Sequence, residues 1–203
     1  IYGKGSDGSW SDTVLLTLNG VVSGNFGYSV SMTDSYAIVG ASVADSDKGA
    51  AYIYGKGSDG SWSGTALLTL NGVDNGDGLG NSVSMTDSYA IVGAPYGRSE
   101  NGSAYIYDVT SPFPSVSPTS MPSSTSTSVA TLVPTSAPTS ESERPLATLL
   151  GLDSGGRFGS RVSMTDSYTI VGAYRANKAY IYGKGSDGSW SSTALVTLNG
   201  VVS

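Results

Sequence analysis

The residues that could do chemistry in this chain are mostly aspartates and hydroxyl residues. The sequence has no histidine and no cysteine. Their absence removes the usual general base, the commonest metal ligand, thiolate sites and disulfides. A serine nucleophile has no histidine to activate it, and no serine and lysine share a strained nucleophile turn. Paired carboxylates for glycoside hydrolysis do not stand out from the turn aspartates. We therefore expect a protein that is not an enzyme and has no resident cofactor.

The strongest candidate for a cation site is the loop Val-Asp-Asn-Gly-Asp-Gly. It offers side-chain oxygens at Asp74, Asn75 and Asp77. Oxygen ligands of this kind are the ones that calcium takes, but calcium needs about six to eight of them. A glycine-rich turn in which Asx side chains cap backbone N–H groups explains the same residues. Both interpretations stay open, and calcium is the only metal that the sequence suggests.

A second set of candidates consists of charged residues in loops that occupy matching positions of an internal repeat. The charge in these loops varies from copy to copy, as it does in a binding face and also in a merely solvated rim. We predict that the loops share one face and that a ligand binds there. The residues are Asp45, Asp47, Lys48, Arg98, Glu100, Arg175 and Lys178.

Two further features bear on carbohydrate. Trp10, Trp62 and Trp190 each follow the same turn, and aromatic faces suit pyranose rings, which would make the chain lectin-like. The alternative is that these rings brace an outer strand against its neighbour. Asn101 begins an Asn-Gly-Ser sequon in a loop that we expect to be exposed, and this sequon predicts N-glycosylation.

The elements that position these residues follow from the repeat. The phrase IYGKGSDGSW begins at positions 1, 53 and 181. The phrase SVSMTDSYAIVGA begins at positions 29 and 82, and a variant, RVSMTDSYTIVGA, begins at position 161. Phrases that recur along the chain in this way indicate a repeat architecture.

Each copy predicts four short strands. Residues 26–32 alternate between apolar and polar, whereas residues 36–41 are nearly all apolar and end in Ile-Val-Gly-Ala. Residues 50–54 form the third strand, and a Gly-Ser-Asp-Gly hairpin leads to a fourth at 62–70. The small residue in Ile-Val-Gly-Ala suits a place where neighbouring backbones crowd. Four antiparallel strands per repeat are typical of a propeller blade, so we predict an all-β fold of β-propeller blades.

The blades are distributed unevenly along the chain. Residues 1–109 hold a partial blade at 1–18, a full blade at 26–70 and the start of another at 79–109. Residues 146–203 hold the remainder of that second full blade and a third. About three and a half blades make a partial propeller that cannot close a ring alone. Because position 1 falls inside a repeated phrase, we expect the remainder of a longer parent chain to complete the propeller, with association of copies as the alternative.

Residues 110–145 form a Ser/Thr/Pro-rich, low-complexity insert. Its apolar content is too low for a packed core, so we expect it to be disordered. Serine and threonine with regular proline are typical of O-glycosylated stalks, and a plain flexible linker is the alternative.

Composition argues against a nucleic-acid partner and against a membrane-spanning helix. The formal net charge is −6 and the pI is about 4.4, and no basic patch is visible, so we expect no nucleic-acid partner. No apolar run reaches the roughly 20 residues that span a membrane.

The repeated phrases resemble FG-GAP repeats. Phe26 and Gly27 match the first element, residues 38–41 the second and residues 51–54 the third, and the later copies match at 79–80, 91–95, 158–159 and 170–173. The resemblance covers almost everything outside the insert. FG-GAP repeats build the seven-bladed propeller at the head of integrin α chains, and they occur in many secreted proteins.

The resemblance implies an extracellular or cell-surface module for interaction or adhesion. Such a module binds a protein or glycan partner through its loops without catalysis. The alternatives are a lectin-like module and an accessory propeller of a larger secreted enzyme. The family's calcium loop, D-x-D-x-D-G, is reduced here to Thr-Asp-Ser at 33–35 and its copies. The family's calcium site is therefore not carried over to this chain.

Overall fold

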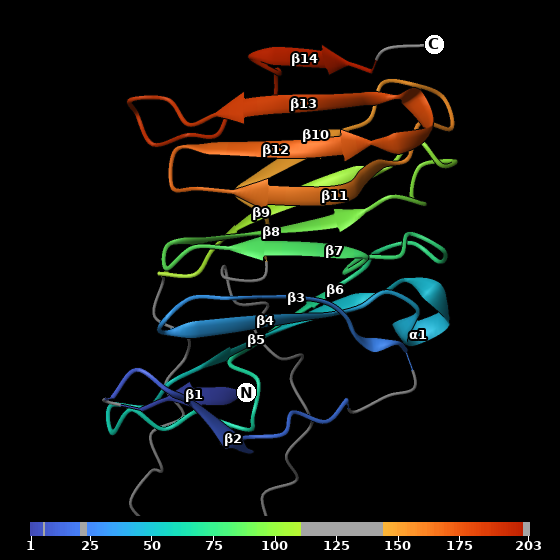
Figure 1. Cartoon of the computed structure of the whole chain (residues 1–203). Helices are drawn as coiled ribbons and strands as arrows, with labels where there is room; N and C mark the ends of the chain where they lie inside the picture. The colour runs from blue at the N-terminus through green and yellow to red at the C-terminus, as the bar shows by residue number, and fades with distance from the viewer. Residues whose placement is uncertain (6, 21–23, 111–143, 201–203) are drawn as a thin grey trace, which may run out of the picture.

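The chain folds into antiparallel sheets that stack one on the next (Figure 1). The computed structural model describes residues 1–5, 7–20, 24–110 and 144–200. Their strands form one two-stranded sheet and three four-stranded sheets. The predicted all-β fold of propeller blades is thereby confirmed. The predicted disorder of the insert concerns residues 111–143, which lie outside the described residues.

The sheets follow the chain in order. The N-terminal hairpin, which we predicted as a partial blade, consists of β1 (Tyr2–Lys4) and β2 (Trp10–Val14). The first blade consists of β3 (Phe26–Met32), β4 (Tyr36–Ala41), the single turn α1 (Ala44–Asp47), β5 (Ala50–Gly55) and β6 (Leu68–Asn71). The second consists of β7 (Ser82–Met85), β8 (Tyr89–Ala94), β9 (Ser103–Asp108) and β10 (Ala147–Leu150). The third consists of β11 (Phe158–Met164), β12 (Tyr168–Ala173), the 3₁₀ turn η2 (Tyr174–Ala176), β13 (Lys178–Gly183) and β14 (Val196–Asn199). Among the described residues, no helix has the length and apolar character needed to cross a membrane.

Within each blade, the strands pair with their neighbours in sequence, so the sheets are meanders. The tight turn between β3 and β4 is closed by the Thr33 hydroxyl, which accepts hydrogen bonds from the backbone N–H groups of Ser35 and Tyr36 at 3.2 and 3.1 Å. In the first two blades the second strand is buried on both faces, as its apolar sequence predicted, whereas β12 of the third blade is partly exposed. The Thr33 turn and the buried apolar run thus both place the start of the second strand after residue 35.

The fourth strand is shorter than predicted. In the first blade it covers only Leu68–Asn71, and Trp62 makes a single isolated bridge to Lys56. Between them the Ser63 hydroxyl donates to the carbonyl of Thr65 and accepts from its N–H. This local side-chain bonding competes with the strand ladder and explains the lost residues.

The third strand of the second blade ends at Asp108 and the fourth begins at Ala147, so the residues that we predicted as an insert stand between them in the sequence. β10 pairs with β9 in full register, with Leu149 opposite Ala104. The two strands thus pair across an insertion longer than thirty residues, because the entropy of closing a loop grows slowly with its length.

Neighbouring blades pack face to face through apolar residues and close backbone contacts. Ile38 and Ile53 of the first blade share a buried cluster with Met85 of the second. A Cβ built on Gly40 would lie 2.1 Å from the carbonyl oxygen of Gly80 in the next blade. Gly93 stands in the same relation to the third blade, so the predicted crowding is confirmed at these two glycines.

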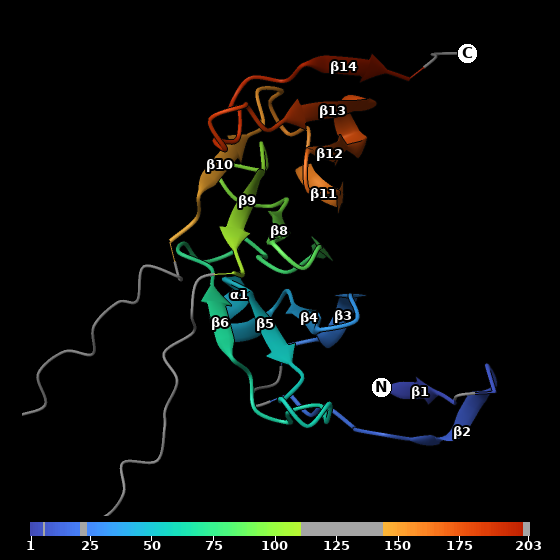
Figure 2. The ribbon, with the colours of Figure 1, turned by 90° about the vertical axis from the view of Figure 1, so that its left-hand side faces the viewer.

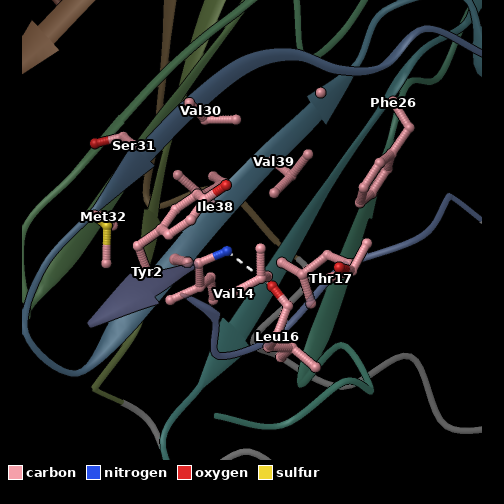
Figure 3. A pocket seen from close by; sticks show the side chains of 14 residues that line it. Tyr2, Val14, Leu16, Thr17, Phe26, Val30, Ser31, Met32, Ile38 and Val39 are labelled. Carbon is pink, nitrogen blue, oxygen red and sulfur yellow. Dashed lines mark hydrogen bonds between the residues drawn. The ribbon is translucent and has the colours of Figure 1, made fainter. Parts of the chain in front are cut away.

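Figure 2 shows the stack edge-on. At its two ends, the first and third blades expose apolar positions whose counterparts in the second blade are buried. Val30 is 67% exposed on the first blade, whereas its repeat counterpart Val83 is 8% exposed. Ile170 is exposed on the third blade, whereas its counterpart Ile91 is fully buried. Beside the N-terminal hairpin, the open face of the first blade borders a largely apolar cavity of about 660 Å³ (Figure 3).

Candidate binding site on the loop face

One edge of the stack carries the second-to-third-strand turns and the connections between blades, and we call it the loop face. It lies on the side of α1 in Figure 1. Each turn bonds to the connection that follows it. The N–H of Gly78 donates to the carbonyl of Asp47 at 3.0 Å, and the N–H of Arg157 donates to that of Glu100 at 3.0 Å. The turns of the first two blades thus contact the connections that follow them, and ligand binding at these loops stays a prediction.

The turns of the first two blades have an unusual backbone. Residues 45–47 and residues 98–100 all have positive φ, between 47° and 66°. None of them is glycine, and left-handed conformations cost such residues roughly 1–2 kcal/mol each. Conformations of this kind concentrate at binding and catalytic sites, where the surrounding structure holds them. The third blade differs, because η2 replaces this turn and only Asn177 has positive φ there.

The predicted charged residues form separate ion pairs along this face. In the first blade, the Lys48 ammonium lies 3.3 Å from the Asp45 carboxylate. In the third, the Lys178 ammonium lies 2.7 Å from the carboxylate of Asp153. That ammonium and the Tyr180 hydroxyl both donate to Asp153 and hold its pKa below the usual value.

Glu100 joins the second blade to the third. Its carboxylate accepts from the Arg157 guanidinium at 3.0 Å and from the Arg175 guanidinium at 2.8 Å. One carboxylate therefore pairs with two guanidinium groups.

The predicted cation loop is a turn stabilised from within. Asp77 is buried, and its carboxylate accepts the N–H of Asp74 at 3.1 Å, while the N–H of Asp77 donates to the carbonyl of Asp74 at 3.2 Å. Asp74 and Asn75 are exposed. Within the described ranges, no group of three or more acidic residues gathers as a metal site. The geometry supports the Asx-turn interpretation, and calcium at this loop stays a prediction.

The family's own calcium position does not fit this chain. The turns at 33–35 and 86–88 hold a single aspartate each, and the threonine hydroxyl of each turn is occupied with the backbone.

Asn101 lies in the turn before β9 and is half-buried, where we expected an exposed position. Its side-chain oxygen accepts the N–H of Gly155 from the third blade at 3.3 Å. The hydroxyl residue of the sequon, Ser103, is buried. Glycosylation at Asn101 stays a prediction, and it would have to displace this contact between blades.

The three tryptophans follow one phrase but occupy different environments. Trp190 is 8% exposed and meets Tyr89 of the second blade edge-on, with the ring centroids 5.6 Å apart. Lys184 lies over the same tyrosine ring at 4.6 Å. Trp62 is half-buried beside Lys56, and Trp10 is 69% exposed. Trp190 thus braces two blades, and the tryptophans do not form a common surface for sugar.

The feature that sequence reasoning missed is a hollow where the three blades meet on the loop face. We call it the three-blade pocket, and its volume is about 280 Å³. It is lined by Tyr28, Asn81, Pro95, Tyr96, Arg157, Ser160, Arg161 and Tyr174.

Two arginines set the chemistry of this pocket. Arg157 lies over the Tyr96 ring at 4.4 Å from its centroid, in a cation–π contact. Arg161 donates to the carbonyl of Ser160 at 2.6 Å and is otherwise exposed. A signal for both was present in the sequence, because they depart from the repeat. Arg157 stands where the other copies have asparagine or glycine, and Arg161 stands where they have serine.

Comparison with known proteins accords with this architecture. The FG-GAP repeat family matches residues 10–54 and residues 62–107. This chain carries FG-GAP repeats. The first matched repeat runs from β2 to β5 and the second from before β6 to β9. Each FG-GAP repeat therefore supplies the end of one blade and the first three strands of the next, which ties successive blades together.

Solved structures extend the likeness in fold alone. A computationally designed protein, Ika4, aligns with a TM-score of 0.50 at 10% identity. The alignment covers 94% of this chain and all of the designed one. In all, 71 chains of solved structures match, and no curated protein matches the sequence.

Proposed function

We propose that the chain is a non-catalytic interaction module, located outside the cell or at its surface, that binds a protein or glycan partner through the loop face. This proposal rests on two features that lie together on the loop face. The backbone turns at 45–47 and 98–100 are held in costly conformations, and a pocket lined by three blades lies beside them.

Composition supports the same proposal. The FG-GAP repeats and the low charged fraction of 13% suit an extracellular role in adhesion. The mucin-like insert, if it is O-glycosylated, makes the chain a glycoprotein. The net charge of −6 disfavours a nucleic-acid partner.

The test is a binding screen against extracellular proteins and glycans with matched charge variants. Lys48→Glu changes the loop face outside the three-blade pocket, and Lys4→Glu makes the same change on the exposed N-terminal hairpin. We expect at least one specific ligand, and we expect Lys48→Glu to weaken it at least about fivefold, while Lys4→Glu leaves it unchanged. Equal binding by both variants to every ligand would contradict a role for the loop face.

We also propose that further FG-GAP blades of a longer parent chain cover the two end faces. The support is that Val30 and Ile170 are exposed, while Val83 and Ile91, their repeat counterparts, are buried by a neighbouring blade.

The chain lacks cysteine, so a single cysteine can be introduced at one of these positions. The rate at which its thiol reacts with a maleimide then shows whether a neighbouring blade covers that position. We expect a thiol at position 30 to react with a maleimide in the isolated chain as fast as one at exposed position 73. In the natural full-length protein it should react at least about tenfold more slowly than position 73. Fast reaction at position 30 in the full-length protein would refute the proposed cover.

A further inference from the structure

We propose that the three-blade pocket is a site for an acidic pyranose residue, a sugar ring that carries a carboxylate or a sulfate. The proposal rests on the binding role of the loop face and deepens it by naming the ligand class.

The charge favours an anion. Three guanidinium groups lie at or beside the pocket, and two of them, those of Arg157 and Arg175, share the single carboxylate of Glu100. Arg161 makes no ion pair among the described residues, and its side chain is exposed. Guanidinium groups bind carboxylate and sulfate oxygens through paired N–H donors, so Arg161 is suited to hold the acidic group.

The rings favour a sugar. Each blade contributes one tyrosine to the lining: Tyr28 from the first, Tyr96 from the second and Tyr174 from the third. All three are exposed, although one face of Tyr96 is covered by Arg157. Aromatic rings with polar tips suit pyranoses, which have apolar C–H faces and a rim of hydroxyl groups. Asn81 and Ser160 add side-chain groups that form hydrogen bonds with such hydroxyls.

The lining is held in place by the backbone. The N–H of Ser160 donates to the carbonyl of Arg157 at 3.2 Å, and the N–H of Tyr96 donates to that of Asp77 at 3.2 Å. A preorganised pocket loses less entropy on binding. Its volume of about 280 Å³ suits one or two sugar rings, and its lining comes from three blades, whereas extended peptides usually bind along an open strand edge or a groove.

Isothermal titration of the whole chain with four probes tests the proposal. The probes are trigalacturonic acid, its methyl ester, a sulfated galactose trisaccharide and an octaglutamate peptide. We expect one of the two acidic saccharides to bind, with affinity that falls as salt rises, and the better binder identifies carboxylate or sulfate as the acidic group. We expect the neutral ester to bind at least about tenfold more weakly than trigalacturonic acid if the carboxylate is the group recognised.

Paired variants locate the site. We expect Arg161→Gln to weaken the bound saccharide about tenfold or more, and Arg144→Gln, at an exposed arginine before β10 and outside the loop face, to leave it unchanged. We expect Tyr174→Leu to weaken it about fivefold or more, and Tyr168→Leu, an equally exposed tyrosine of the third blade, to leave it unchanged. All four residues are exposed, and circular dichroism verifies that each variant is folded.

Three results would overturn the proposal. They are the absence of binding by both acidic saccharides, wild-type affinity in Arg161→Gln, and tighter binding of octaglutamate than of either saccharide. If the Lys48→Glu variant still loses a partner found in the screen, the role of the loop face stands although the assignment to acidic sugar fails. If no partner depends on Lys48 but Arg161→Gln loses the saccharide, the proposal for the three-blade pocket holds and the proposed role of the rest of the loop face fails.

Discussion

Replacing Gly93 with alanine is the sharpest test of how the blades pack. Gly93 is the last residue but one of β8, and a Cβ built there would lie 2.0 Å from the carbonyl oxygen of Gly159 in the third blade. The obstacle is backbone, which cannot rotate away as a side chain can. The Ser82 hydroxyl crowds the same point and already donates to that carbonyl at 2.8 Å.

The magnitude follows from this overlap. Real Cβ atoms essentially never approach heavy atoms closer than 3.0 Å, so the second and third blades must separate by about 1 Å at this point. Overpacking usually costs about 1–3 kcal/mol, and an obstacle made of backbone places this case at about 3 kcal/mol. For a chain of this length, that loss lowers Tm by about 6–12 °C.

The third copy of the repeat provides the control. A Cβ on Gly172 would have its nearest neighbours at 3.6 Å, which is ordinary contact. Neither glycine has positive φ, so alanine suits both backbones. We therefore expect Gly172→Ala to be neutral or to stabilise the chain by up to about 1 kcal/mol, through the lower entropy of its unfolded state.

The assay is urea and thermal unfolding of both variants beside the wild type, followed by circular dichroism. A gap of about 3–4 kcal/mol between two substitutions in the same Ile-Val-Gly-Ala context is the expected outcome. Equal destabilisation would show that a local strand effect, and not the neighbouring blade, governs these glycines, and the packing argument would fail.

Two further predictions use the repeat as its own control. Trp190→Ala should cost about 3–5 kcal/mol of unfolding free energy because the ring is buried between blades, whereas Trp10→Ala should cost little because that ring is 69% exposed; similar unfolding midpoints for the two variants would contradict this. The pKa of the Asp59 carboxylate is lowered because the Ser61 hydroxyl and backbone N–H both donate to it. We therefore expect Ser61→Ala to raise that pKa toward its ordinary value in carboxyl NMR titrations. The pKa of Asp187, measured in the same sample, should stay unchanged. Because the pKa of Asp59 is lower in the folded chain than in the unfolded chain, the hydrogen bonds from Ser61 stabilise the folded state at pH values above the unfolded pKa. This stabilisation is lost as the pH falls through the folded pKa. An unchanged Asp59 titration in Ser61→Ala would refute the role of Ser61.

Local chemistry determined what could be predicted from the sequence. The strand boundaries at 26–32 and 36–41 follow from alternation, from a continuous apolar run and from the Thr33 turn, all of which act within a few residues. The place of the insert and the shared loop face follow from the repeat, because equal phrases fold equally. The fourth strand came out shorter, since Ser63 forms a local bond whose geometry the apolar pattern does not report.

The binding pocket depends on contacts far apart in sequence. Tyr28 and Tyr174 line one hollow although 146 positions separate them in the printed sequence. No local pattern encodes that approach. The departures of Arg157 and Arg161 from the repeat were visible but had no meaning until the blades were stacked.

The sequence alone determined that this protein is made of FG-GAP blades, because strand period and turn residues act locally and recur in every copy. Tertiary structure alone decided what each copy does. One phrase buries Trp190 and exposes Trp10, and one motif crowds Gly93 and leaves Gly172 open. The physical reason is that burial and close approach depend on the neighbouring blade, and the repeats are alike while their neighbours differ.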